Sequence, residues 1–440
     1  MRHPVRRSIT VPTALLVGLS VSFLAQQPAG ERPGRIVLGW AGDPATSRTV
    51  TWRTSDPVAE PRAQIAVAPP GSAIEKAATT VPALSAKVTL AADTAVYHHS
   101  ARFEGLQPAT RYVYRVGDGK TWSEWFEFVT ASAQPAPFRF IYLGDAQNGL
   151  NDQWPRTARA AYARAPDARF MVFAGDLLAE GYDDRLWEQW HAGLGFIAAS
   201  VPPLAVPGNH DEHRAPGSAN PKKVMDVSAL WRAHFALPEN GPTLPGLEGQ
   251  NWCLDYQGVR FIGLDANPFA NEDYVESERA RVQQAETAWL EDLLAHNLNR
   301  WTVVVAHQTF YSVAKDRDYP ELRSKVAPIL DRYHVDLVLQ GHDHMYSRSR
   351  KLFGGRVVGP AEPGTIYVVS VSGSKMYEVS DRYAALMEKM IPQVQLYHVV
   401  GVDGDRLMFE SYTADGRRVD AFSLVKSAGG SIYKSEGAAR

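Results

Sequence analysis

The 440-residue sequence has little cysteine, no excess of charge of either sign and no apolar run of bilayer length. Its single cysteine, Cys253, excludes an intramolecular disulfide framework and any zinc site built from several cysteines. The 46 Lys and Arg residues nearly balance the 48 Asp and Glu residues, so the net charge of −2 argues against a nucleic-acid-binding protein. The sequence also lacks a G-x-x-x-x-G-K-[ST] phosphate loop and a G-x-S-x-G nucleophile elbow. P-loop nucleotide hydrolysis and elbow-type serine hydrolysis are therefore without support.

The first residues have the composition of an export signal. Arg2, Arg6 and Arg7 form a basic start, and residues 11–25 form an apolar run of 15 residues, shorter than the roughly 20 that span a bilayer. We therefore predict an export signal at residues 1–29, a periplasmic or secreted protein and no transmembrane helix. General or twin-arginine export, and an uncleaved N-terminal anchor, stay open as alternatives. A lone cysteine is compatible with an oxidising compartment.

Residues 34–131 have the pattern of an all-β domain. Short runs of β-branched and aromatic residues alternate with Gly, Pro and Asp, and Tyr112, Tyr114 and Val116 recur at period two. Five such runs are clear, whereas a sandwich has about seven strands in about 100 residues. The segment GLQPATRYVYRVGDG resembles part of a fibronectin type III domain, where a Tyr after L-x-P packs at a strand corner. We therefore predict an all-β sandwich that is fibronectin III-like.

A second domain is predicted at residues 138–426, after a Pro/Ala-rich linker and before a flexible tail at 427–440. Seven near-continuous apolar runs are typical of strands covered on both faces: FRFIYL, RFMVFA, PLAV, RFIGL, WTVVVA, DLVLQ and TIYVVS. Helical patterns lie at 183–197, 277–296 and 321–333. The buried face expected for the second helix consists of Val282, Ala285, Ala288, Trp289 and Leu293. The pattern predicts a layered α/β domain with β-sheets flanked by helices.

Polar side chains follow five of these apolar runs at the point where each run ends. They are Asp145, Gln147, Asp176, Asn209, His210, Asp211, His307, His342 and His344. Because open α/β sheets bind ligands at the carboxyl ends of their strands, we expect these side chains to meet at one end of a sheet. A Gly precedes four of the five groups, which allows close approach of a ligand to the backbone.

The donor types in this set favour metal chemistry. Carboxylates, carboxamides and imidazoles are the mixed oxygen and nitrogen ligands of Zn, Mn, Fe and Ni. Two such ions about 3.5–4 Å apart stabilise both the attacking and the leaving oxygen of a phosphoryl displacement. A shared carboxylate would hold the pair together. Asp176 is the candidate bridge because its motif lies between the others in the chain.

The same five motifs resemble those of a known family. GDAQ, GDLLAEG, GNHD, VVAH and GHDH are similar, in this order, to the motifs of the calcineurin-like metallophosphoesterases. The fibronectin-like domain before them, and Tyr346 after the last motif, make the chain similar to the purple-acid-phosphatase branch of that family. The resemblance implies an acid-phosphatase-like hydrolase that acts on a small phosphorylated substrate, and it leaves the oligomeric state open.

The resemblance also implies two metal ions, of Fe, Mn or Zn, that are both divalent or of mixed valence. One would bind Asp145, Asp176 and His344, with Gln147 as a candidate further ligand, and the other would bind Asp176, Asn209, His307 and His342. A metal-bound hydroxide would attack phosphorus. His210 would protonate the leaving group, and Asp211 would orient His210.

One position departs from the purple acid phosphatases. Their colour comes from a tyrosinate on ferric iron, supplied three residues after the second Asp in the pattern GDxxY. In this sequence that position is Ala179, and Tyr182 lies three residues further on. We therefore expect a pair of divalent metals and a protein that is not purple.

Each motif also has an ordinary structural explanation. Asp145 and Asp176 are compatible with helix caps, His307 with a core histidine, and Gln147 with a surface side chain that has no role. The leading function is a phosphomonoesterase, followed by a phosphodiesterase acting on nucleotides or lipid head groups. A non-catalytic adhesion or interaction protein with a decayed phosphatase domain is the alternative of another class. The complete set of candidate ligands, with His210 in GNHD, argues against such decay.

Overall fold

The structure, a computed structural model, describes residues 32–40, 42–91, 94–212, 227–270, 275–427 and 430–435. The export signal predicted at residues 1–29 lies outside these ranges. Within the described ranges, no helix is both long enough and apolar enough to cross a membrane.

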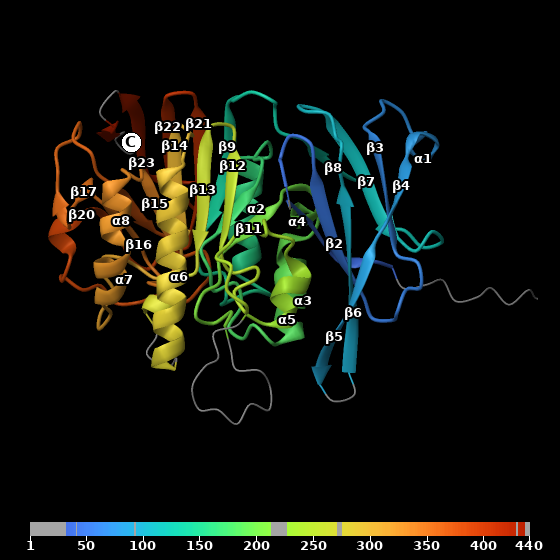
Figure 1. The fold of residues 1–440 in the computed structure, drawn as a ribbon, viewed down its shortest axis with the longest axis horizontal. Coiled ribbons are helices and arrows are strands. Elements are labelled where there is room, and N and C mark those ends of the chain that lie inside the picture. The colour runs from blue at the N-terminus through green and yellow to red at the C-terminus, as the bar shows by residue number, and fades with distance from the viewer. Residues whose placement is uncertain are drawn as a thin grey trace, which may run out of the picture. The chain divides into compact units, whose positions relative to one another are not determined.

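The N-terminal domain is a β-sandwich of two four-stranded antiparallel sheets, with the orders β1-β2-β6-β5 and β4-β3-β7-β8 (Figure 1). Its elements are β1 (Gly34–Gly39), β2 (Arg48–Thr54), β3 (Arg62–Val67), α1 (Ile74–Ala77), β4 (Thr79–Pro82), β5 (Leu84–Ala91), β6 (Thr94–Phe103), β7 (Arg111–Gly117) and β8 (Phe126–Val129). Trp52, Phe103 and Tyr114 are buried in its core. Tyr112 Oη accepts a hydrogen bond from the Gln107 backbone N–H at 2.8 Å, the corner packing expected of the Tyr after L-x-P.

The second domain contains two seven-stranded sheets, and all seven predicted apolar runs form strands of them. The first sheet is β11 (Pro203–Ala205), β10 (Met171–Phe173), β9 (Phe138–Leu143), β21 (Leu396–Asp403), β22 (Arg406–Thr413), β23 (Arg418–Ser427) and β24 (Gly430–Ser435). The second is β12 (Trp252–Tyr256), β13 (Val259–Leu264), β14 (Trp301–Ala306), β15 (Leu337–Gln340), β19 (Ile366–Val369), β16 (Tyr346–Ser349) and β20 (Met387–Ile391). A separate hairpin pairs β17 (Leu352–Phe353) with β18 (Arg356–Val357).

The two large sheets pack face to face, and helices cover their outer faces (Figure 1). The rings of Phe140 in β9 and Phe261 in β13 lie 5.2 Å apart between the sheets. The helices are α2 (Trp154–Arg164), α3 (Asp184–Leu194), α4 (Ile197–Ser200), α5 (Ala229–His234), η1 (Asn267–Phe269), α6 (Glu276–Ala295), α7 (Pro320–Lys325), α8 (Ala327–Arg332) and η2 (Ala384–Leu386). Leu290 of α6 and Leu330 of α8 share a core with Val304 of β14, so these helices cover the second sheet.

The sandwich is joined to the second domain by specific contacts. Helix α4 packs against β1 and β8. Tyr114 Oη donates a hydrogen bond to the Ala199 carbonyl at 2.6 Å. Arg35 of β1 forms an ion pair with Asp184, the first residue of α3, at 2.5 Å. The sandwich therefore packs directly on the elements that follow β10.

Two predictions about this domain are wrong in detail. The chain after residue 427 is not simply a flexible tail, because Gly430–Ser435 form β24, which pairs with β23. Of the predicted apolar face of α6, Val282 is buried and Trp289 and Leu293 are partly buried, but Ala288 is exposed, and the other buried residues of the helix are Gln283, Glu286, Leu290 and Leu294. Two polar residues are buried there, and each has a hydrogen-bond partner, although Glu286 Oε2 has none within the described residues. Gln283 donates to the Pro268 carbonyl, and Glu286 accepts from Asn251.

Candidate metal centre

The five strand ends predicted to carry functional residues meet at one place, but they come from two sheets rather than one. β9, β10 and β11 deliver their polar residues from the first sheet, and β14 and β15 deliver theirs from the second. Because the sheets pack face to face, the carboxyl ends of these strands lie together. The site is therefore assembled between the two sheets.

Two groups of buried side chains at this place have the spacing needed to hold a metal ion. One group is Asp176, His307 and His342, and the other is Asp145, Asp176 and His344. Within each group the candidate ligand atoms lie within 4.8 Å of one another. Asp176 belongs to both groups, which is the arrangement expected of a carboxylate that bridges two ions.

The two predicted amide ligands lie beside these groups. Gln147 Nε2 lies 3.1 Å from Asp176 Oδ2 and 3.0 Å from His344 Nε2. A half-turn of its amide would bring Oε1 to the same position. Gln147 is 4% exposed, so the alternative of a surface side chain is wrong. Asn209 Oδ1 lies 3.3 Å from His307 Nε2, on the side of the other group.

The backbone at the site adopts conformations that non-glycine residues seldom take. Asp145 (φ 38°), Asp176 (φ 50°), His342 (φ 71°) and His344 (φ 37°) all lie in the left-handed region. Such residues cost of order 1–3 kcal/mol each and persist where the surroundings hold them, most often at functional sites. The backbone conformation that positions these four candidate ligands therefore lowers the stability of the folded protein.

Glycines before the motifs provide the room that these turns need. A Cβ atom on Gly208 would lie 2.2 Å from Asp176 Oδ1, and one on Gly341 would lie 2.5 Å from Asp145 Oδ2. Both distances are far inside van der Waals contact. The candidate ligands thus pack directly on glycine backbone, as the sequence pattern predicts.

The electrostatics of the site call for positive charge between the two carboxylates. Burial, and the charge of Asp176 nearby, raise the pKa of Asp145 well above its usual value. Burial would also raise the pKa of Asp176, but the charge and hydrogen bond of His307 hold it well below its usual value. Burial opposes protonation of His307, yet Asp176 raises its pKa to about 9. A protonated His307 therefore balances Asp176 in the protein alone.

The donor atoms present fit a pair of metal ions. Asp145 Oδ1 is buried, makes no hydrogen bond with the described part of the chain and lies 3.4 Å from His344 Nε2. Burial lowers the pKa of His344 to about 3 and that of His342 well below its usual value, so both rings are neutral. Neutral imidazole is the form that binds metals. A divalent cation would interact favourably with this carboxylate oxygen and with the neutral imidazoles beside it.

The two predicted catalytic residues have different surroundings. The half-buried His210 donates its backbone N–H to Asp176 Oδ1 at 2.9 Å, and its ring Nδ1–H donates to the Ala179 carbonyl at 2.9 Å. The prediction that Asp211 orients His210 is wrong. The Asp211 carboxylate instead accepts from the backbone N–H groups of Leu177 and Gly208. The Asp211 carboxylate points toward these groups because the backbone N–H of Asp211 closes a tight turn on the Gly208 carbonyl.

Asp211 consequently holds together the two loops that carry Asp176 and Asn209. It is completely buried, and burial with the charge of Asp176 raises its pKa to about 8. Asp183 caps α3 by accepting the Arg185 N–H at 2.9 Å, and Cys253 is a small buried residue of β12.

A tyrosine that no sequence motif marks lies beside the candidate ligands. Tyr319 Oη lies 2.5 Å from His342 Nε2, while His342 Nδ1 faces His307 Nε2 at 3.0 Å. The phenol thus contacts the ring nitrogen that points away from the other candidate ligands. It is placed to fix the tautomer and orientation of the imidazole.

A cationic cluster was also missed. Arg317 donates Nη1 to the His342 carbonyl at 3.1 Å and Nη2 to Tyr377 Oη at 3.0 Å, with its guanidinium 4.5 Å above the Tyr377 ring. The Lys375 ammonium lies 5.2 Å from the centre of that ring. These residues follow the ends of β14 and β19, so the available signal was their position after a strand. No motif distinguishes them.

Comparisons with known proteins agree with this geometry. Residues 33–130 match the purple acid phosphatase N-terminal domain, and residues 138–346 match the calcineurin-like phosphoesterase family. An uncharacterised protein of Mycobacterium tuberculosis is 28% identical over 79% of this chain and 71% of its own length. Human acid phosphatase type 7 is 26% identical over 78% of this chain and 76% of its own length.

A solved structure supports the fold independently. The purple acid phosphatase PPD1 from yellow lupin (Lupinus luteus) seeds covers 90% of this chain and 75% of its own, with a TM-score of 0.74 at 19% sequence identity. At that identity the likeness concerns the fold alone. Taken with the two matched families, the chain combines a purple acid phosphatase N-terminal domain with a calcineurin-like phosphoesterase domain.

Proposed function

We propose that the protein is a binuclear metal-dependent phosphomonoesterase. The observation that carries this proposal is the pair of buried Asp/His groups that share Asp176. One ion would be held by Asp145, Asp176, His344 and Gln147, and the other by Asp176, Asn209, His307 and His342. When bound, the two ions would supply Lewis acidity and an activated water for displacement at phosphorus.

His210 is the candidate general acid. Its backbone is fixed by Asp176 and its Nδ1–H by the Ala179 carbonyl, so the ring has a defined orientation beside the metal ligands. Nε2 is the ring nitrogen that would give a proton to the leaving oxygen. Its half-buried position lets it meet a substrate that enters from solvent.

The charges around the site favour a monoester over a diester. A phosphate monoester carries up to two negative charges and a diester carries one. The Arg317 guanidinium and the Lys375 ammonium flank Tyr377, whose ring lies 4.5 Å from that of His344. Both cations would interact more strongly with the doubly charged ester.

From the N-terminal sequence alone, we also propose that the enzyme acts in the periplasm or is secreted.

Metal removal and reconstitution test the proposal. Exhaustive chelation should abolish hydrolysis of 4-nitrophenyl phosphate, and Mn, Zn or Fe should restore it, with two ions per chain by elemental analysis. Bis(4-nitrophenyl) phosphate should be the poorer substrate. Asp176→Asn should lose both ions and activity, whereas Asp292→Asn, on the exposed face of α6, should lose neither. Full activity of the metal-free protein would exclude the mechanism. Two bound ions without hydrolysis of either ester would favour the non-catalytic alternative.

A second experiment tests the role of His210. His210→Ala should keep both ions and lose about 10²–10⁴-fold in rate, the typical contribution of a positioned acid. The loss should be smaller for nitrophenyl than for alkyl esters, because a good leaving group needs no proton. Equal losses for both esters would remove the general-acid role.

A further inference from the structure

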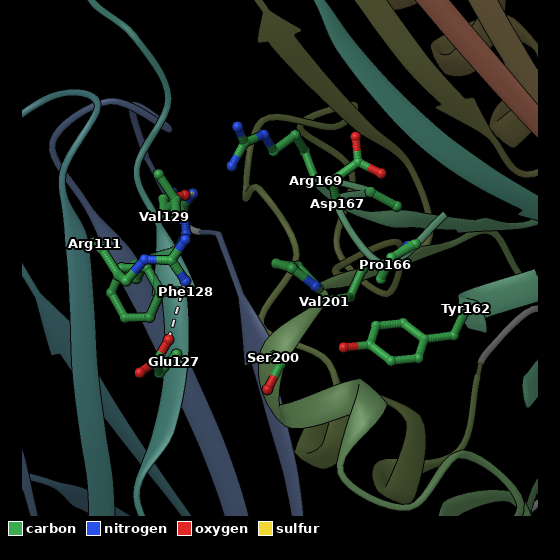
Figure 2. Close-up of a pocket in the computed structure, with 13 residues that line it drawn as sticks. Arg111, Glu127, Phe128, Val129, Tyr162, Pro166, Asp167, Arg169, Ser200 and Val201 are labelled. Carbon is green, nitrogen blue, oxygen red and sulfur yellow. Dashed lines mark hydrogen bonds and ion pairs between the residues drawn. The ribbon is translucent and has the colours of Figure 1, made fainter. Parts of the chain in front are cut away.

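A cleft between the sandwich and the second domain carries features that the proposed function does not use. Its volume is about 430 Å³, within the usual range for small-molecule sites. The sandwich lines one wall with residues of β7 and β8, and the second domain lines the other from α2, α4 and the chain before β10. Figure 2 shows the side chain of Arg169 reaching from the second wall toward the strand that carries Phe128 and Val129.

The carboxylates of this cleft are already neutralised. Glu127 forms an ion pair with Arg111 at 3.0 Å across neighbouring strands (Figure 2). Asp167 forms an ion pair with Arg139, which lies outside the cleft. Two lining cations remain, Arg48 and Arg169. Among the residues that the structure describes, neither has a carboxylate within ion-pair distance.

Arg48 is an unusual cation because it is almost completely buried, at 1% exposure. Within the described ranges, its Nη1 and Nη2 donate only to backbone carbonyls, those of Pro44, Ser47 and Val129, and its Nε has no partner. Its guanidinium lies over the rings of Trp40 and Phe128. Burial and the charge of Arg169 lower the pKa of Arg48 to about 9. The wall of the cleft thus holds a buried charge that forms no ion pair within the described residues, although the charge of Asp43 partly opposes the shift of its pKa.

We propose that this cleft binds a small organic anion, with its carboxylate or phosphate oxygens on Arg169 and its apolar body against Phe128 and Val201. Arg169 is half-buried, and its guanidinium makes no hydrogen bond within the described part of the chain, so its donors are available to a bidentate oxyanion. The positive charge of Arg48, buried in the wall of the cleft, also attracts the anion. The Tyr162 ring lies on the opposite side of the same space (Figure 2).

Such a ligand would act on the joint between the domains. It would contact Phe128 of the sandwich and Arg169 of the second domain together, so its binding would stabilise their association. The cleft is lined by none of the candidate metal ligands. The ligand is therefore an effector rather than a substrate, and the proposal stands independently of the proposed catalytic activity.

Calorimetric titration of the full, metal-loaded protein with sodium benzoate tests the proposal. Benzoate carries one carboxylate on an aromatic body, and we expect one bound molecule per chain and a raised melting temperature. Arg169→Gln should weaken binding by roughly 10-fold to 100-fold, the loss expected for a charge-assisted contact. Arg156→Gln, an exposed arginine of α2, is the matched control and should bind like the wild type. Arg169→Lys keeps the positive charge but loses the bidentate donor geometry of the guanidinium, so its affinity for benzoate should lie between those of Arg169→Gln and the control.

The remaining outcomes are also decisive. Inorganic phosphate should compete with benzoate, since it shares the oxyanion but lacks the apolar body, and its competition should weaken in Arg169→Gln. The melting temperature of Arg169→Gln without ligand reports whether the variant is folded. Absence of benzoate binding up to its solubility limit, or equal binding by the wild type and a folded Arg169→Gln variant, would overturn the proposal.

Discussion

Acid should weaken the joint between the two domains, because three histidines are buried there without the partners that a charged imidazole needs. His98 of β6, His191 of α3 and His234 of α5 are 4%, 8% and 1% exposed. The ring of His234 lies 4.7 Å from that of His98 and 4.9 Å from that of His191. In all three, Nε2 is buried and has no hydrogen-bond partner among the residues that the structure describes. We call these residues the histidine cluster.

The size of the effect follows from the pKa shifts. Burial, followed by the charges of Arg35 and Arg53, lowers the pKa of His98 to about 4, although Asp184 opposes the shift. Relative to an unfolded value of about 6.5, this is a difference of about 2.5 units, or about 3 kcal/mol. Burial also places the pKa values of His191 and His234 well below the usual value.

The pKa of each histidine in the cluster is lower in the folded state than in the unfolded state, and this decides how stability changes with pH. Above about pH 6.5 the histidines are neutral in both states and do not affect stability. Between about pH 6.5 and 4 the unfolded chain binds protons that the folded chain does not, so the free energy of unfolding falls as the pH falls. His98 alone should account for about 3 kcal/mol of this loss, with further losses from the other two.

Urea denaturation at a series of pH values measures the effect. His98→Gln removes the titrating group, so its free energy of unfolding should fall less steeply than that of the wild type, by about 3 kcal/mol over the window. His296→Gln is the control, because His296 is an exposed residue after α6. Parallel loss of stability by the wild type and His98→Gln would refute the reasoning.

Three further predictions concern the candidate metal centre. Tyr319→Phe removes the phenol oxygen that lies 2.5 Å from His342 Nε2. The affinity of the protein for one of the two metal ions, measured by competition with a chelator, should fall by about 10-fold to 100-fold. Arg317→Gln should raise KM for 4-nitrophenyl phosphate more than for the diester, whereas an equal rise would refute a charge-selective role. Gly208→Ala would place Cβ 2.2 Å from Asp176 Oδ1, so calorimetry should show at least about 2 kcal/mol of lost stability together with lost metal.

Much of the architecture was predictable from local sequence. Near-continuous apolar runs marked strands buried on both faces, and period-two runs marked the sandwich. The polar residues at the ends of β9, β10, β11, β14 and β15 identified the candidate site because carboxyl ends of strands collect ligands. In these regions the local signal and the final environment agree.

What could not be predicted depends on contacts between distant parts of the chain. β9 pairs with β21, which lies more than 250 residues later, and no local pattern specifies that partner. The division of the strand ends between two sheets follows from this pairing. In the same way, Glu286 and Gln283 belong to the buried face of α6 only because Asn251 and Pro268 supply their hydrogen-bond partners.

The side chain of Asp211 shows the same limit at the scale of one loop. In the sequence it follows His210 directly, which favoured an orienting role. The turn closed by its N–H on the Gly208 carbonyl directs its carboxylate to the Leu177 and Gly208 N–H groups instead. Adjacent residues in a tight turn point in different directions, so proximity in sequence did not predict contact.

The colour of the iron-loaded protein follows from the same loop geometry. At the position where purple acid phosphatases supply a tyrosinate, this chain has Ala179, whose carbonyl accepts the His210 Nδ1–H at 2.9 Å. Among the described residues, the phenols of Tyr319 and Tyr377 lie beside candidate ligands. Tyr319 Oη contacts His342 Nε2, on the side of the ring away from His307, and Tyr377 Oη accepts from Arg317. Neither phenol oxygen is directed at the shared Asp176.

We therefore expect the wild-type protein, loaded with iron under air, to lack the intense visible band of a tyrosinate-to-iron charge transfer. Ala179 is half-buried, so Ala179→Tyr can introduce a phenol where the purple enzymes carry theirs. This variant should gain the band if the first ion lies among Asp145, Asp176 and His344, because the new side chain starts three residues after the shared carboxylate. A purple wild-type protein that loses its colour in Tyr182→Phe would show that a tyrosine ligates after all, and a pair of divalent ions would then no longer be the expected occupancy.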